Sequence, residues 1–152
     1  MKLKKIVNLL EKEFPTALAE DWDNVGLMVG EGSAEISKVQ ISLDITDEVI
    51  ENAVENRVNL IITHHPMIFK GIKSINDGTK MGRRIIKLIK EGIAVYSLHT
   101  NLDSAENGLN NYIALKLGME SGKITEPHNI KFFKVKLEFE IKDNTTEEEI
   151  DI

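Results

Sequence analysis

The chain contains no cysteine, and aromatic residues make up only 5% of its 152 positions. The lack of cysteine excludes disulfide bonds, thiolate catalysis and zinc fingers, so a bound metal would need nitrogen and oxygen ligands. No apolar run approaches the length of a membrane span. Acidic residues outnumber basic ones, 25 to 19, which argues against direct nucleic-acid binding because that requires clustered Lys and Arg. We therefore expect a cytoplasmic protein that contacts neither a membrane nor nucleic acid.

Apolar spacing predicts helices that alternate with short buried strands. Helices are expected at residues 3–14, 47–54, 79–91 and 106–117, with Thr46 and Gly118 as capping residues. Strands are expected at residues 39–43, 60–62 and 93–98. Residues 20–33 form a polar, glycine-containing stretch that holds the only tryptophan. The residues expected to face inward from the last two helices are Met81, Ile85, Leu88, Ile89, Leu109, Ile113 and Leu117.

This alternation is typical of βαβ crossovers and predicts an α/β fold, a mostly parallel sheet with helices on both faces. We expect one domain over residues 1–152. Parallel strands end at the same edge, so Asp44, His64-His65 and His99 should converge at the carboxyl tips of the sheet.

The end of the chain has a different pattern. Apolar and charged residues alternate over 133–141, which predicts a half-exposed strand, and residues 146–149 read as a capping box at the start of a helix. The chain ends three residues later, so it resembles the front portion of something longer. A frayed acidic tail is the alternative.

The three histidines at the predicted strand tips are candidate metal ligands. Adjacent histidines on a regular strand point to opposite faces. His64 and His65 can converge because the strand ends there and Pro66 favours an extended or turn conformation for His65. Asp103 adds a carboxylate four residues after His99. We predict a divalent metal on His64, His65 and Asp103, with zinc, iron, manganese and nickel equally suited to such ligands.

The neighbouring residues allow more than one role. His99 is a ligand, a partner of a ligand or a substrate hydrogen-bonder, and we favour the last two and assign it as the catalytic residue. Asp103 could instead cap the following helix. Four further residues are candidates to line the site: Trp22, Asp23, Asn24 and Asp44. Asp44 could equally cap the helix near Thr46, and a lone tryptophan more often packs in a core.

Three motifs, at residues 21–30, 62–69 and 97–103, resemble those of the GTP cyclohydrolase 1 type 2 family, also called the NIF-three-like family. The resemblance runs to about residue 141. It implies an α/β fold, two divalent metals in each full-length site, and a homo-oligomer, often a hexameric ring. By position, His64, His65 and Asp103 match the family's metal ligands, and His99 matches a histidine close to the site.

The sequence also departs from this family. The family's remaining ligands are a histidine and a glutamate four residues apart near the C-terminus, whereas here His128 is followed four positions later by Phe132. Met28 stands where the family usually has glutamine, and Asn111 where it usually has aspartate. The chain thus looks like the N-terminal half of such a protein, and missing ligands should weaken its metal cluster.

Three functions follow as hypotheses. The first is a metal-dependent hydrolase that uses a metal-activated water on a small-molecule substrate, which the family name implies is a nucleotide. The second is a non-catalytic metal-binding or oligomeric interaction and regulatory protein, which the absent ligands favour. The third, a plain nucleotide-binding module, is least favoured because the chain lacks a glycine-rich phosphate loop.

Overall fold

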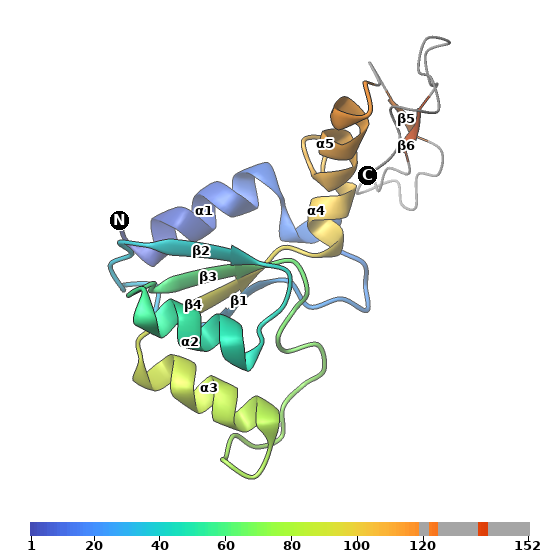
Figure 1. The fold of residues 1–152 in the computed structure, drawn as a ribbon. Coiled ribbons are helices and arrows are strands. Elements are labelled where there is room, and N and C mark those ends of the chain that lie inside the picture. The colour runs from blue at the N-terminus through green and yellow to red at the C-terminus, as the bar shows by residue number, and fades with distance from the viewer. Residues whose placement is uncertain (119–121, 125–136, 140–152) are drawn as a thin grey trace.

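Figure 1 shows the chain as a computed structural model, which describes residues 1–118, 122–124 and 137–139. The helices are α1 (Leu3–Glu13), α2 (Asp47–Glu55), α3 (Lys80–Lys90), α4 (Thr100–Ser104) and α5 (Leu109–Lys116), with a short 3-10 helix η1 (Thr16–Leu18). The strands are β1 (Gly26–Val29), β2 (Val39–Ser42), β3 (Leu60–Thr63), β4 (Ala94–Ser97), β5 (Gly122–Ile124) and β6 (Leu137–Phe139).

The main sheet has the strand order β1-β4-β3-β2. Strands β2, β3 and β4 are parallel, with Ile41 opposite Ile62 and Ile62 opposite Tyr96. The three predicted strands and their shared direction are therefore confirmed, and their carboxyl ends lie along one edge. A separate antiparallel pair joins β5 to β6.

Strand β1 was not predicted. It lies inside residues 20–33, the polar, glycine-containing stretch for which no strand was expected. It pairs antiparallel with β4, so β1 and β2 are the two edge strands of this sheet. Two glycines with positive φ angles, Gly26 (97°) and Gly30 (137°), mark its ends. At Gly30 a Cβ atom would lie 2.7 Å from the Cβ of Ala94, so this glycine lets the chain pass closely over β4.

Helices cover both faces of the sheet, as predicted: α1 lies on one face, and α2 and α3 lie on the other (Figure 1). Successive strand residues point to opposite faces, so the parallel strands contribute to two cores. Leu60 and Tyr96 pack with Leu3 of α1. Ile61 and Val95 pack with the residues of α2 and α3. All five of these side chains are fully buried.

The helix predictions hold in position but not for every inward residue. Thr46 caps α2 by accepting a hydrogen bond from the Val49 amide at 3.2 Å. Ile89 and Ile113, predicted to face inward, are 60% and 45% exposed. Ile89 lines an open apolar groove beside β1. Helix α5 extends beyond the sheet next to α4 (Figure 1), so α5 buries only Ala114. The short helix α4 was not predicted.

The remaining predictions on the tail are only partly within the described residues. Strand β6 falls inside the predicted strand at 133–141, whereas the helix start at 146–149 lies outside the described residues.

Among the helices that the structure describes, none has the length and apolar character required to cross a membrane.

Candidate metal centre

The backbone at the strand tips is fixed by pairing that continues past the strands. The His64 amide donates to the Ser42 carbonyl at 3.3 Å, and the His65 amide donates to the Leu43 carbonyl at 2.9 Å. Between the tips of β3 and β4, the buried hydroxyls of Thr63 and Ser97 are hydrogen-bonded at 3.0 Å. The histidines therefore project from an ordered sheet edge.

Three histidines gather at this edge. His64, His65 and His99 each offer a ring nitrogen, and these three atoms all lie within 4.8 Å of one another. The ring centroids are 5.0 Å apart for His64 and His99, 5.2 Å for His64 and His65, and 5.7 Å for His65 and His99. The predicted convergence of the three side chains is confirmed, and its spacing suits binding of one metal ion.

The hydrogen bonds of the three rings decide which nitrogen is available. The Nδ1 atom of His64 lies 2.9 Å from the Leu98 carbonyl oxygen, that of His65 lies 2.8 Å from Asp44 Oδ1, and that of His99 lies 2.9 Å from Asp23 Oδ1. Carbonyl and carboxylate oxygens only accept, so each Nδ1 must carry the proton. A neutral ring then leaves its Nε2 lone pair free. This tautomer, fixed by a carboxylate or carbonyl partner, is typical of metal-binding histidines.

Asp23 is the most firmly held of these partners. Its carboxylate is fully buried, and it accepts hydrogen bonds from the amides of Asn24 (2.8 Å) and Thr100 (3.1 Å), from the Thr100 hydroxyl, and from His99. Burial alone raises the pKa of Asp23, but the hydrogen bonds from Thr100, His99 and Asn24 together hold the pKa below its usual value. The carboxylate is therefore ionised where it holds the His99 ring.

Asp44 has a weaker version of the same role. Its carboxylate binds His65 Nδ1, and both side chains are about half exposed. Of the two roles that we left open for Asp44, the structure shows contact with His65, a predicted ligand, whereas the cap of α2 is Thr46.

The other predicted residues occupy different positions around the cluster. Asn24 donates from Nδ2 to the Ile68 carbonyl, which ties residues 23–24 to the loop after the histidine pair. Trp22 is 59% exposed and does not pack in a core. Its ring meets that of His99 edge-on, with the centroids 6.2 Å apart.

Asp103 lies in α4, where its amide donates to the His99 carbonyl at 3.2 Å. Its half-buried side chain is not in the three-histidine group, so its role as a ligand stays a prediction.

Asn101 was not among the residues predicted at the site. This residue is fully buried, accepts from the His99 amide at 3.0 Å through Oδ1, and donates to the Phe14 carbonyl at 2.9 Å. It fixes the backbone at His99 where α4 begins. The role of Asp23 in orienting His99 was also missed, although Asp23 itself was placed at the site. A pairing across 76 residues has no local sequence pattern that would reveal it.

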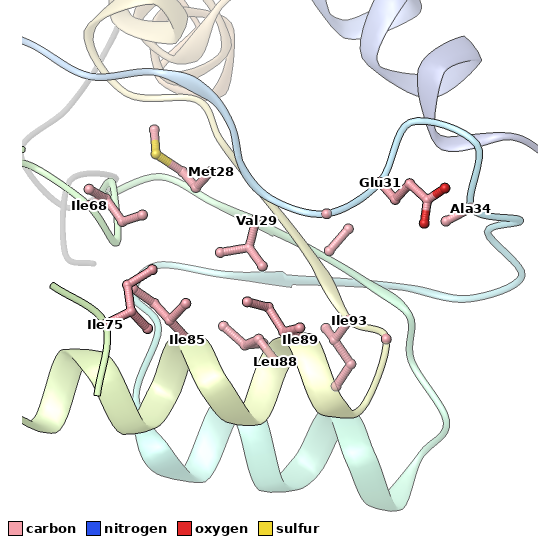
Figure 2. Close-up of a pocket in the computed structure, with 13 residues that line it drawn as sticks. Met28, Val29, Glu31, Ala34, Ile68, Ile75, Ile85, Leu88, Ile89 and Ile93 are labelled. Atoms are coloured by element: carbon pink, nitrogen blue, oxygen red, sulfur yellow. The ribbon is translucent and has the colours of Figure 1, made fainter. Parts of the chain in front are cut away.

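An apolar groove of about 510 Å³ lies apart from the histidines, between β1 and α3. Figure 2 shows Met28 and Ile68 toward one end of its lining and Ile93 toward the other, above the residues of α3. Glu31 is the only ionisable residue among those that line it. The groove has no set of groups for acid–base or metal chemistry, so the histidine cluster is the stronger candidate site.

Fold and site together define a mixed α/β domain with a preorganised histidine cluster at the carboxyl ends of parallel strands. The chain belongs to the Duf34/NIF3 (NGG1p interacting factor 3) family, whose model it matches over residues 1–150. This confirms the resemblance found in the sequence motifs.

Individual relatives agree with this assignment. The chain is 46% identical over 126 residues to a GTP cyclohydrolase 1 type 2 homolog of Clostridium perfringens, which covers 83% of this chain and 48% of the relative. Staphylococcus aureus protein SA1388 superposes with a TM-score of 0.76 at 39% identity, covering 84% of this chain and 36% of that one. Reduced HcgD from Methanocaldococcus jannaschii gives 0.74 at 36% identity, covering 82% and 50%. The chain spans half the length of these relatives or less.

Proposed function

We propose that the protein binds divalent metal ions at His64, His65 and His99, and that this centre serves a metal-dependent hydrolase. The observation that carries the proposal is the set of three Nδ1 hydrogen bonds, which directs Nε2 of each neutral ring toward ligand binding in three neighbouring histidines. Such a set fits a borderline divalent ion such as zinc, iron, manganese or nickel. Asp103 is the proposed oxygen ligand, and a site with two ions is proposed from the family resemblance.

A divalent ion bound here would supply Lewis-acid activation of water and of an electrophilic substrate. The protein's own groups would prepare the ligands for it. Asp23 and Asp44 hold the Nδ1 protons of His99 and His65, which fixes the tautomer and the orientation of each ring. We propose His99 as a metal ligand in place of the catalytic role predicted above, because Asp23 occupies Nδ1 and Nε2 is the one nitrogen left for either role.

For the substrate, we propose only a chemical class, a nucleotide. The name of the curated relatives supports a nucleotide, and the carboxyl edge of a parallel sheet is where α/β proteins bind small molecules. Assembly with further copies of the chain is proposed from the family resemblance.

The test is the metal content per chain, by elemental analysis of protein purified without chelator. We expect at least one ion per chain, and its loss in a His64→Ala/His65→Ala variant. His128→Ala, which changes the chain's fourth histidine, is the matched control and should keep the metal. Metal well below one ion per chain in the unaltered protein would refute the proposal.

A second function, as an assembly or interaction protein, is favoured by the exposed face of β2. Val39 and Ile41 of this edge strand are 44% and 82% exposed, and Leu43, directly after the strand, is 59% exposed. Exposed apolar stripes of this kind mark interaction surfaces. An assembly protein should keep its oligomeric state, measured by light scattering, when His64 and His65 are alanine. A hydrolase should lose metal-dependent turnover in the same variant.

A further inference from the structure

Two exposed aromatic rings lie beside the histidine cluster. Trp22 is 59% exposed and Phe69 is 45% exposed. Their ring centroids are 5.8 Å apart, with the ring planes tilted by 52°. The Trp22 ring also meets the His99 ring edge-on at 6.2 Å. The two rings therefore form a small aromatic surface that borders the proposed metal ligands.

The backbone beneath both rings is held by the hydrogen bonds of the site. Trp22 directly precedes Asp23, whose buried carboxylate binds His99 and Thr100. Phe69 directly follows Ile68, whose carbonyl accepts from Asn24. The same network therefore places the metal ligands and the aromatic surface, which gives exposed rings a fixed position relative to the cluster.

The surroundings of the rings distinguish this surface from a protein-docking patch. Three exposed polar residues, Asp21, Asn24 and Lys70, lie within two positions of the rings in the sequence, together with the buried carboxylate of Asp23 and the partly buried Ile68. Interfaces between proteins are usually broader apolar areas. A pair of aromatic rings within polar surroundings fits a ligand that is itself one flat ring with polar edges. Aromatic side chains bind such rings by stacking, without selecting among bases.

We propose that Trp22 and Phe69 form a subsite that stacks a planar heteroaromatic ring, such as a nucleobase, next to the metal ligands. The inference rests on the proposed function, because it places this ring where the reacting centre would be. It assigns substrate binding to Trp22 and Phe69, and it names a ring system as the chemical class that the site accepts.

Trp22 is the only tryptophan of the chain, so tryptophan fluorescence, excited at wavelengths that tyrosine does not absorb, reports on this subsite. The experiment is a titration of the full chain with guanosine 5′-monophosphate, with ribose 5-phosphate as the control that lacks the ring. We expect saturable quenching by the nucleotide and none by the sugar phosphate. Equal quenching by both, or no quenching up to millimolar nucleotide, would overturn the inference.

A set of variants tests which ring binds. Loss of a stacking ring should weaken nucleotide binding about 5- to 150-fold, as measured by equilibrium dialysis of Phe69→Leu and Trp22→Leu. Tyr112→Leu is the matched control, since Tyr112 is similarly exposed (58%) but lies on α5 against Lys116. Unchanged affinity in Phe69→Leu and Trp22→Leu, or an equal loss in Tyr112→Leu, would refute the assignment.

Metal content measured on the same samples separates this inference from the proposed function. Metal at the histidines without nucleotide quenching would refute the stacking subsite and leave the metal centre standing. Saturable quenching in protein that holds no metal would support the subsite and refute the metal centre.

Discussion

Replacement of Asp23 by asparagine should remove the carboxylate that orients His99 while all the proposed metal ligands stay in place. Asp23→Asn keeps the size of the side chain and removes its charge. One carboxylate oxygen faces the Asn24 amide and the other faces the Thr100 amide and hydroxyl, while His99 bridges both. An asparagine presents an NH2 group to one of these sets of donors, so donors that are now paired would face another donor.

The magnitude follows from the contacts that are lost. One or two hydrogen bonds to a charged group would disappear at a fully buried side chain. At about 1.5–3 kcal/mol for each such bond, the free energy of unfolding should fall by roughly 2–5 kcal/mol. The His99 ring would also lose the partner that fixes its tautomer, and loss of such partners lowers metal affinity by about 10- to 100-fold.

Two assays measure these effects. Urea unfolding gives the change in free energy, and competition with a chromophoric chelator gives the metal affinity. Asp21→Asn is the matched control, because it removes the same charge two residues away at an exposed position. If Asp23→Asn behaves like Asp21→Asn in both assays, the role assigned to Asp23 is wrong.

The same carboxylate predicts a dependence of stability on pH. The pKa of Asp23 in the folded chain lies below its unfolded value, so its contribution is complete above the unfolded pKa of about 4. The contribution is lost as the pH falls from there through the folded pKa. Between pH 7 and pH 3, the unaltered protein should therefore lose more unfolding free energy than Asp23→Asn, and equal losses would contradict this.

Three further predictions concern other parts of the molecule. Asp103→Asn should lower metal affinity by about tenfold or more while changing the free energy of unfolding by less than about 0.5 kcal/mol; unchanged affinity would remove Asp103 from the ligand set. Gly82→Ala should destabilise α3 by about 1–3 kcal/mol in urea unfolding, because the new Cβ would lie 1.9 Å from the Asn76 carbonyl oxygen; an unchanged midpoint would contradict this packing. Ile41→Lys should leave stability within about 0.5 kcal/mol, since Ile41 is 82% exposed, and should weaken any self-association seen by light scattering; unaltered association would exclude the β2 face.

Local periodicity was enough to predict the parallel part of the fold. Strands β2, β3 and β4 carry short apolar runs, and α1 to α3 carry apolar faces at helical spacing, so the pattern of each element agreed with its place in the sheet. Strand β1 was not predicted, because it has only four residues, starts at Gly26 and is followed by Gly30. Its pairing partner is β4, far along the chain. The five residues of α4 are too few to establish a helical period.

In the site too, features with a local sequence pattern were predicted and features that depend on tertiary contacts were missed. The convergence of His64, His65 and His99 followed from the shared direction of two strands, which the sequence indicates. Asp44, the partner of His65, was among the predicted site residues. The roles of Asp23 and Asn101 did not follow, because they act through tertiary contacts with His99 and with the end of α1. The exposure of Trp22 also went against the usual packing of a lone tryptophan, and the tertiary network around Asp23 accounts for its placement.

The hydrogen bonds of the cluster also constrain the order of folding. The partners of His65, His64 and His99 lie 21, 34 and 76 residues away along the chain, so no single βα unit can assemble the complete centre. The contact between Asp23 and His99 closes the longest loop and needs β1 in place beside β4, which is a slow kind of contact to form. A metal ion that binds only this finished arrangement would stabilise the native state by about 2.7 kcal/mol at a hundredfold excess over its Kd. At the proposed centre, metal uptake during refolding should therefore follow the docking of β1 beside β4.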